Sequence, residues 1–153
     1  MVADNVNVER DGAEQRRMRD RLERALTCTD PTFDHFFLQQ LLGLDISYGE
    51  RSCVIRAPDS PYLLNSLGTS MNGGLLAMVI DISMGHLCRR FLSPAVTLDL
   101  HVAYLRPVTG PAVCEAWFLN EGRRVVTMRA SVQDGAGETC VTATGTCYRR
   151  SDS

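Results

Sequence analysis

The sequence predicts an α+β domain in which one long, buried helix lies against an antiparallel sheet. Apolar residues in segment 75–91 would occupy nearly every side of a helix, which is typical of a helix enclosed by other elements. Two strand-like runs precede this segment and four follow it, with turn signals between them. Because the sheet must curl to cover so apolar a cylinder, we expect it to wrap around the helix.

The strands are recognised by their alternating pattern and by the turns between them. The strand after the helix has apolar residues at every second position, namely Val96, Leu98, Leu100, Val102 and Tyr104. It stops at Arg106-Pro107, since proline cannot donate to a sheet. The remaining strands are expected near residues 44–48, 53–57, 112–119, 124–133 and 139–149. Turn-forming residues predict an irregular loop over residues 58–72.

Two helices are expected before the sheet. The first covers residues 8–26, where a thin apolar stripe recurs every four residues at Met18, Leu22 and Leu26. The second begins at Asp30-Pro31, which suit a cap and a first-turn proline, and Gly43 closes it. We therefore expect an N-terminal helical extension over residues 1–43 and one further domain over residues 44–150.

The composition suits one core of ordinary size. Of the 153 residues, 44% are hydrophobic and 22% are charged, which supplies apolar material for a single core. The formal net charge is -2 with both signs mixed, so there is no broad basic field for binding nucleic acid. A small ligand held by local anchor points fits this charge pattern better.

The cysteines and the N-terminus indicate a reduced, cytoplasmic protein. Six cysteines are scattered without the two-residue spacing of zinc sites or redox pairs, so we expect neither a metal nor another cofactor. Small, buried core positions suit them. Residues 1–9 are polar and acidic, unlike a secretory signal, and no apolar run is long enough to cross a membrane.

Asp81 most needs an explanation, because it lies in the most apolar stretch of the sequence, residues 75–82. Burying an unpaired carboxylate is costly, so Asp81 needs a hydrogen-bonding partner, a raised pKa or a place that water reaches. An aspartate held by a neighbouring polar group for structural reasons is one interpretation. A poised carboxylate in a cleft is the interpretation that we favour.

The start of the same helix offers a site for an oxyanion. Gly73 and Gly74 let a ligand approach backbone N–H groups at the positive end of the helix dipole, although such a pair can also be only a turn. Gly73 and Asp81 are eight residues apart, which is roughly 12 Å along a helix axis. One subunit therefore cannot bring both to one carbonyl group. Two antiparallel helices across a two-fold axis can, which predicts a homo-oligomer, either a dimer or a dimer of dimers.

Five short motifs occur in order within residues 44–150. They are Asn65-Ser66-Leu67-Gly68-Thr69-Ser70-Met71-Asn72-Gly73-Gly74, Asp81, Val96-Thr97-Leu98-Asp99-Leu100, Tyr104-Leu105-Arg106-Pro107 and Gly122-Arg123. Together they resemble the hotdog thioesterases of the phenylacetate-degradation type, called PaaI-like. The resemblance implies a hotdog fold and the hydrolysis of an acyl-CoA thioester to a free acid and CoA.

The resemblance also implies roles for individual residues. The Gly73 N–H would hold the oxyanion, and Asp81 of the partner subunit would act as base or nucleophile. Asn65 and Thr97 would help to place the substrate or water. This division of labour suits thioester hydrolysis, because the CoA thiolate leaves without strong protonation.

Asn72 departs from the family pattern, which usually has His directly before the two glycines. An amide can donate a hydrogen bond to a carbonyl group, but it cannot carry a proton near neutral pH. We therefore expect Asn72 to act by hydrogen bonding, and Met71 and Gly74 nearby to contact the substrate.

Five arginines are candidates for binding the CoA phosphates, with a plain surface charge as the alternative for each: Arg106, Arg123, Arg124, Arg149 and Arg150. Two other functions stay open. One is a hotdog protein that binds acyl-CoA or an acyl carrier without hydrolysis, as Asn72 could indicate, and the other is a structural partner subunit. Asp81 argues against a mere binding protein, because an apolar residue would serve a binding pocket better there.

Overall fold

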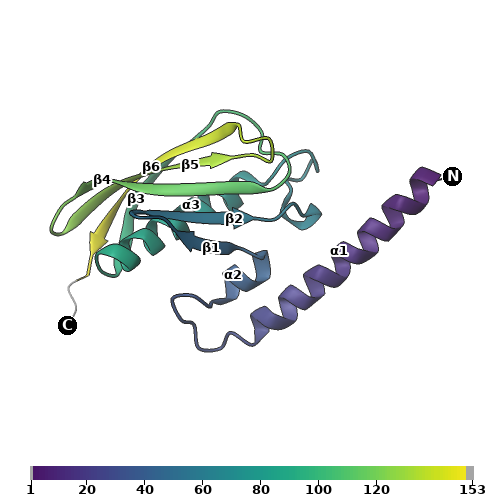
Figure 1. The fold of residues 1–153 in the computed structure, drawn as a ribbon, viewed down its shortest axis with the longest axis horizontal. Helices are drawn as coiled ribbons and strands as arrows, with labels where there is room; N and C mark the ends of the chain where they lie inside the picture. The colour runs from purple at the N-terminus through teal and green to yellow at the C-terminus, as the bar shows by residue number, and fades with distance from the viewer. Residues whose placement is uncertain (1, 151–153) are drawn as a thin grey trace. The chain divides into compact units, whose positions relative to one another are not determined.

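The computed structural model describes residues 2–150 of the chain, and side chains from residue 12 onward. Its contacts divide the chain into two compact units, one ending at Leu44 and one beginning at Asp45. The first unit has two helices, and the second holds a sheet and the long helix (Figure 1). The second unit carries every residue of the predicted site.

The helices of the first unit are α1, Val2–Leu26, and α2, Phe37–Leu42. Gly43 ends α2 in the left-handed conformation, with φ 67°, as its position predicted. The expectation that the second helix begins at Asp30-Pro31 was wrong. Thr32 and His35 exchange backbone hydrogen bonds there, at 2.9 and 3.4 Å, so the chain closes a turn before the helix starts.

The second unit contains one six-stranded antiparallel sheet with the strand order β1-β2-β4-β5-β6-β3. Its strands are β1 Asp45–Tyr48, β2 Ser52–Ala57, β3 Ala95–Tyr104, β4 Ala112–Glu121, β5 Val125–Gln133 and β6 Thr139–Arg149. Short turns join β1 to β2, β4 to β5 and β5 to β6. β1 and β3 therefore lie at the two edges of the sheet.

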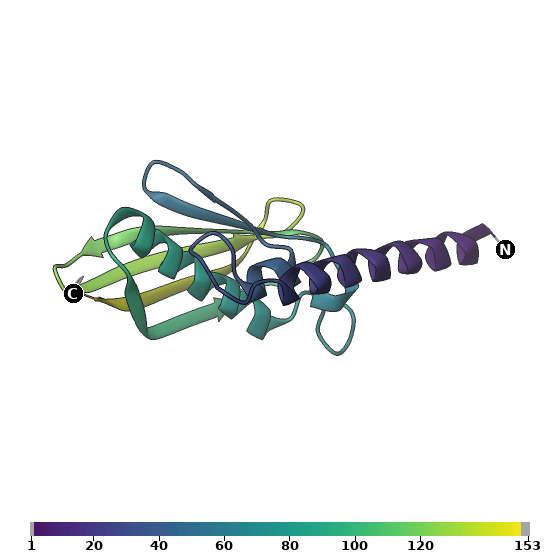
Figure 2. The same cartoon turned by 90° about the horizontal axis from the view of Figure 1, so that it is seen from below.

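The long helix α3, Gly73–Phe91, runs along one face of the curved sheet (Figure 1, Figure 2). Ile80, Met84 and Leu87 on its covered side are at most 1% exposed. Gly145 of β6 allows helix and sheet to approach closely, because a Cβ there would lie 2.8 Å from the Met84 sulfur. The predicted α+β arrangement of one long helix wrapped by an antiparallel sheet is confirmed.

One side of α3 is left half-exposed by its own chain, so the expectation of a helix buried on every side was wrong. The half-exposed residues along this side are Ala77, Met78, Asp81, Ile82 and Gly85. Most of them are apolar or small, and for this reason the sequence pattern predicted a helix that is buried on all sides. Apolar surfaces of this kind are typical of contacts between proteins.

β3 contains a bulge between Thr97 and Asp99, so the strict alternation predicted for this strand was wrong. Thr97 pairs with Cys147, whose side chain is buried, whereas Asp99 pairs with Thr146 on the other face of the sheet. The extra residue, Leu98, moves Thr97 onto the face that covers α3. Without the bulge, Thr97 would point away from the helix.

The predicted irregular loop before α3 is confirmed, and it is fixed at both ends. It holds a short 3₁₀ helix, η1, Pro61–Leu63, and an isolated bridge between Leu64 and Met71. The Met71 N–H also donates to the Val108 carbonyl at 2.9 Å. The bridge closes the loop on itself, and the bond to Val108 attaches it to the segment that follows β3, just before α3 begins.

Replacing Ile80 by Ala is expected to lower the free energy of unfolding by about 2–5 kcal/mol, because it leaves a cavity beneath α3. Ile80 is 0% exposed, whereas Leu119 of β4 is 53% exposed and provides the matched control. Leu119→Ala should change the free energy of unfolding by less than about 0.5 kcal/mol. Urea unfolding at one protein concentration measures both values, and equal losses would contradict this packing.

Candidate active site

Asn72 begins α3 and holds its first turn. Its backbone is extended, with φ -62° and ψ 130°, and its side-chain Oδ1 accepts a hydrogen bond from the Leu75 N–H at 3.1 Å. The amide oxygen is thus engaged, and the side-chain NH₂ group is the part that can donate to a ligand. This capping role was missed in the sequence, although an Asn directly before a helix start is a known signal for it.

Gly73 and Gly74 occupy the first two positions of α3, where backbone N–H groups have no partner inside the helix. Among the hydrogen bonds of residues 2–150, neither of these N–H groups has an acceptor. The positive end of the helix dipole lies at the same place. A carbonyl oxygen that gains negative charge would be stabilised here.

An open pocket of about 350 Å³ lies beside the start of α3. It is lined by Asn65, Ser70, Met71, Gly73, Leu76, Tyr104, Leu105, Arg106, Pro107 and Val108. Four of the predicted site residues, Asn65, Met71, Gly73 and Arg106, are therefore brought together. A mostly apolar wall with a few polar groups suits the acyl end of a thioester.

Tyr104 was missed as a site residue. Its hydroxyl donates to the Gly73 carbonyl oxygen at 2.6 Å, and its ring carbons lie 3.4 Å from where a Gly73 Cβ would stand. A Cβ at Gly73 would therefore stand in ordinary van der Waals contact with the ring. In the sequence, Tyr104 was the last apolar position of an alternating strand and the first residue of one of the five motifs, and nothing local indicated this bond.

Asn65 organises the loop that forms one wall of the pocket. Its Oδ1 accepts from the N–H groups of Leu67 and Thr69 at 3.1 and 3.2 Å. Its Nδ2 donates to the Ser70 hydroxyl at 3.0 Å. Both ends of the amide are thus engaged in shaping the loop, and the role of Asn65 in placing substrate or water stays a prediction.

Asp81 lies midway along α3, on the side that its own chain leaves half-exposed. The Thr97 hydroxyl donates to Asp81 Oδ1 at 2.6 Å, so the carboxylate has the hydrogen-bonding partner that its apolar surroundings require. The bulge in β3 allows this bond, because it turns Thr97 toward the helix. Asp81 and Thr97 thus form a second part of the predicted site.

These two parts do not meet within one subunit. Asp81 is not among the residues that line the pocket at Gly73. The eight residues between Gly73 and Asp81 correspond to roughly 12 Å along the axis of α3. A single chain therefore does not bring the Gly73 N–H and the Asp81 carboxylate to one atom of a ligand.

The five arginines that are candidates for binding phosphate lie in two separate places. Arg106 lines the pocket at Gly73 and forms an exposed ion pair with Glu138 at 3.1 Å, a type of pair that contributes little to stability. Arg123 and Arg124 line a separate pocket of about 390 Å³ beyond the other end of α3. Arg149 and Arg150 line this second pocket as well, and the role of the five arginines in binding the CoA phosphates stays a prediction.

Five of the six cysteines are buried as predicted, namely Cys53, Cys88, Cys114, Cys140 and Cys147. The prediction was wrong for Cys28, which is only half-buried because it lies in the first unit, outside the core of the sheet and α3. Burial raises the pKa of Cys53 to about 12 and that of Cys114 to about 11, so both thiols stay protonated at neutral pH. Cys147 lies behind Thr97, with its sulfur 3.9 Å from the hydroxyl, and a hydrogen bond with Cys88 lowers the pKa of Cys147. In the part of the chain that the structure describes, no metal-binding group of His, Cys, Asp or Glu is present.

Known proteins share this architecture. The family model described as Thioesterase superfamily matches residues 68–141, from the loop before α3 into β6. A conserved Pseudomonas aeruginosa protein of known structure is 29% identical with a TM-score of 0.68, covering 77% of this chain and 97% of its own. The E. coli PaaI protein of the phenylacetic acid degradation operon has a TM-score of 0.73 at 18% identity, covering 86% and 97%.

The chain thus has the hotdog fold that its short motifs led us to expect, and its segment 68–141 matches the Thioesterase superfamily. A "Putative esterase" of Saccharolobus solfataricus is 30% identical over 95 residues. That match covers 59% of this chain and 63% of the relative, so it spans less than two thirds of the relative's length. Within residues 2–150, every helix is too short or too polar to cross a membrane.

Replacing Asn72 by Ala is expected to lower the free energy of unfolding by about 1 kcal/mol, because the Leu75 N–H loses its acceptor. Asn72→Ser retains a capping oxygen and should stay within about 0.5 kcal/mol of the parent. Urea unfolding of the three proteins measures the difference. Equal stability of the Ala and Ser variants would show that the side chain of Asn72 does not cap α3.

Proposed function

We propose that the protein hydrolyses acyl-CoA thioesters at sites that two subunits share. The main support is the 2.6 Å hydrogen bond by which Thr97 holds the Asp81 carboxylate on an otherwise apolar side of α3. The N–H of Gly73 supplies the second requirement, a donor for the oxyanion. All three residues fall within the segment 68–141 that matches the Thioesterase superfamily.

The edge strand β3 supports a second copy of the chain as the partner. Its Val96, Leu98 and Tyr104 side chains are 48%, 58% and 52% exposed. A long apolar edge strand offers unpaired backbone groups, and proteins normally cover such an edge. The half-exposed side of α3 adjoins β3, because the two elements meet at the bond between Thr97 and Asp81. A second copy would cover both surfaces in one contact.

Antiparallel pairing of β3 with its copy would also complete the site. Tyr104, the last residue of β3, contacts Gly73, whereas Thr97, near its beginning, contacts Asp81. In an antiparallel pair, the end of one strand faces the beginning of the other. Gly73 of one subunit would therefore approach Asp81 of its partner, and symmetry would give two equivalent sites.

In such a site, the thioester carbonyl oxygen would accept a hydrogen bond from the Gly73 N–H as negative charge develops on it. Asp81 of the partner would take a proton from the attacking water, or would attack the carbonyl carbon itself. The bond from carbon to sulfur then breaks, and CoA leaves as its thiolate. Water supplies the second oxygen of the free acid in either case. The Asn72 NH₂ group beside Gly73 could donate one further hydrogen bond.

CoA as the carrier of the acyl group is supported by other proteins of this fold. A Bacillus halodurans protein, with a TM-score of 0.77 at 22% identity over 93% of this chain, has its structure with CoA. A Streptococcus mutans protein, with a TM-score of 0.66 at 20% identity, has its structure bound to acetyl CoA. Their fold accommodates CoA in those proteins, and the same fold here makes an acyl-CoA the first substrate to test.

A protein that binds acyl-CoA without hydrolysis is the second candidate. Asn72 favours it, because an amide cannot shuttle protons and its oxygen already accepts from Leu75. Asp81 favours hydrolysis, since binding alone gains nothing from a carboxylate on an apolar surface. The contact with Thr97 keeps that carboxylate in one position, which is more useful for catalysis than for packing.

Replacing Asp81 by Ala is expected to lower kcat by about 10²–10⁴, the usual contribution of a positioned acid or base. A thiol-release assay over short, long, branched and aromatic acyl-CoAs measures it. Asp99→Ala is the matched control, because Asp99 is a carboxylate on the opposite face of β3 that bonds to Thr146. If the Asp81 variant hydrolyses every substrate at the parent rate, Asp81 is not the catalytic carboxylate.

Replacing Leu98 by Asp is expected to convert the dimer to monomers and to reduce activity by at least about tenfold, because the contact between the two copies would bury a carboxylate without a partner. Leu119→Asp is the control, since Leu119 is exposed to a similar degree, 53% against 58%, but lies on β4. Light scattering gives the mass in solution. A monomeric Leu98 variant with full activity would rule out shared sites.

A further inference from the structure

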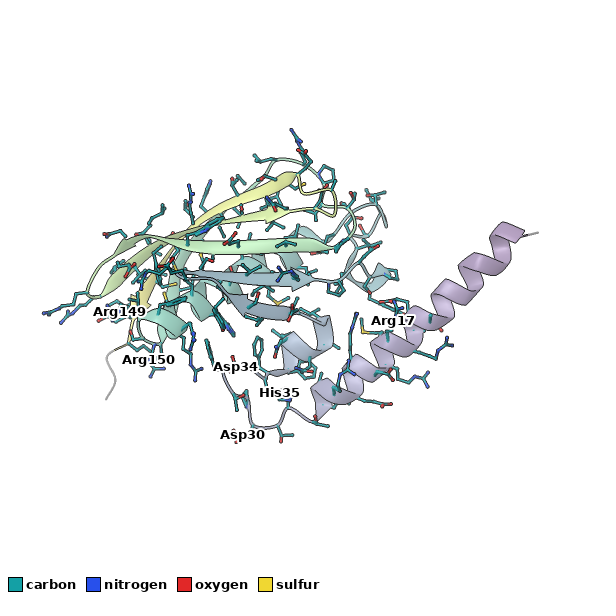
Figure 3. The ribbon with its side chains drawn as sticks, viewed as in Figure 1. Arg17, Asp30, Asp34, His35, Arg149 and Arg150 are labelled. Atoms are coloured by element: carbon teal, nitrogen blue, oxygen red, sulfur yellow. The ribbon has the colours of Figure 1, made fainter. Side chains whose placement is uncertain are left out.

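Four arginines gather at the end of the second unit that lies beyond the C-terminus of α3. The pocket of about 390 Å³ there is lined chiefly by Arg123, Arg124, Arg149, Arg150, Ser93 and Tyr148. Figure 3 labels Arg149 and Arg150 where β6 ends beside the last turns of α3. This local positive charge stands in contrast to the formal net charge of -2 for the whole chain.

Hydrogen bonds fix the segments that carry these arginines. The Arg149 N–H donates to the Arg124 carbonyl and the Arg150 N–H donates to the Pro94 carbonyl, both at 2.8 Å. The Arg149 Nε also donates to the Ser93 hydroxyl at 3.1 Å, which orients that guanidinium group. The turn before β5, the end of β6 and the chain before β3 therefore form one framework.

The carboxylates of residues 12–150 form no ion pair with these four arginines. Glu121, two residues before Arg123, pairs instead with Arg51. Four like charges in one pocket repel each other, and an anion that bridges them removes this repulsion. Guanidinium groups match phosphate in particular, because they donate two parallel hydrogen bonds to it.

We propose that this arginine pocket binds the 3′-phosphorylated adenosine diphosphate part of CoA and thereby selects CoA thioesters over carrier-protein thioesters. This inference rests on the proposed function. Asp81 and Phe91, at the end of α3, are ten residues apart, which is roughly 15 Å along the helix axis. The extended pantetheine arm of the substrate would cover this separation between the reacting carbon and the phosphates.

The form of the pocket favours a nucleotide over a carrier protein. A concave pocket of about 390 Å³ suits a small ligand, whereas a protein partner needs a contact of about 800 Å² on each side. CoA brings three phosphate groups to four guanidinium groups, and a carrier's phosphopantetheine brings one. Tyr148 is 39% exposed and offers a ring face on which adenine can stack.

Calorimetric binding of adenosine 3′,5′-bisphosphate tests the pocket without any thioester chemistry. Arg149→Gln, and Arg123→Gln together with Arg150→Gln, should each weaken binding about tenfold or more, because charged hydrogen bonds are lost. Arg123 and Arg150 are exposed, so the double variant should keep its fold. Arg129→Gln is the control, since Arg129 stacks on Trp117 outside the pocket, and its affinity should equal that of the parent.

In hydrolysis assays, the parent should have a higher kcat/KM for acyl-CoA than for acyl-pantetheine. The variant with Arg123→Gln and Arg150→Gln should reduce this ratio about tenfold, because its KM for acyl-CoA rises. Unchanged bisphosphate affinity in every pocket variant would overturn the proposal. Faster turnover of a carrier-protein thioester than of acyl-CoA, lost in the same variants, would also overturn it. A protein that binds the bisphosphate but hydrolyses no thioester would sink the proposed function alone, and hydrolysis without bisphosphate binding would sink only this inference.

Discussion

The hydrogen bond from Thr97 to Asp81 is the contact on which the candidate site depends. It gives a partner to a carboxylate on an apolar helix and joins the edge strand β3 to α3. The bulge at Leu98 makes it possible, because it turns Thr97 inward while the rest of β3 keeps its pairing with β6. The half-exposed side of α3 and the exposed edge of β3 become neighbours for the same reason, and together they form a surface suited to a second copy.

The main elements and the two reactive positions could be predicted because their signals are local. Apolar residues around a whole helix and alternation along strands define α3 and the sheet, and a carboxylate among apolar residues singles out Asp81. The bulge gave no such signal, since Leu98 keeps the alternation from Val96 to Tyr104 regular in the sequence. The pairing of β3 with β6 decides on which face of the sheet Thr97 lies. In the sequence, therefore, only the motif resemblance could indicate that Thr97 belongs to the site.

The remaining differences arise from contacts between distant residues. The Tyr104 hydroxyl donates to the carbonyl of Gly73, a residue 31 positions earlier in the sequence. No local sequence pattern predicts this bond. Arg124 and Arg149 were both candidates for phosphate binding, but they are far apart in the sequence, so their proximity was not predicted. The predicted strands 124–133 and 139–149 form a hairpin, however. The antiparallel pairing of that hairpin places Arg124 next to Arg149, so their proximity could have been inferred from the two predicted strands.

Mixing two inactive variants tests most directly whether Gly73 of one subunit and Asp81 of the other act on one thioester. Gly73→Pro removes the N–H donor but should leave the start of α3 intact. Proline is tolerated at the first position of a helix, and the residue before it, Asn72, already has the extended backbone that proline requires. Hybrid dimers with Asp81→Ala chains would contain one intact site and one site lacking both groups. Random mixing should therefore restore about a quarter of the parent activity. Demonstrably mixed dimers that stay inactive would contradict the shared site.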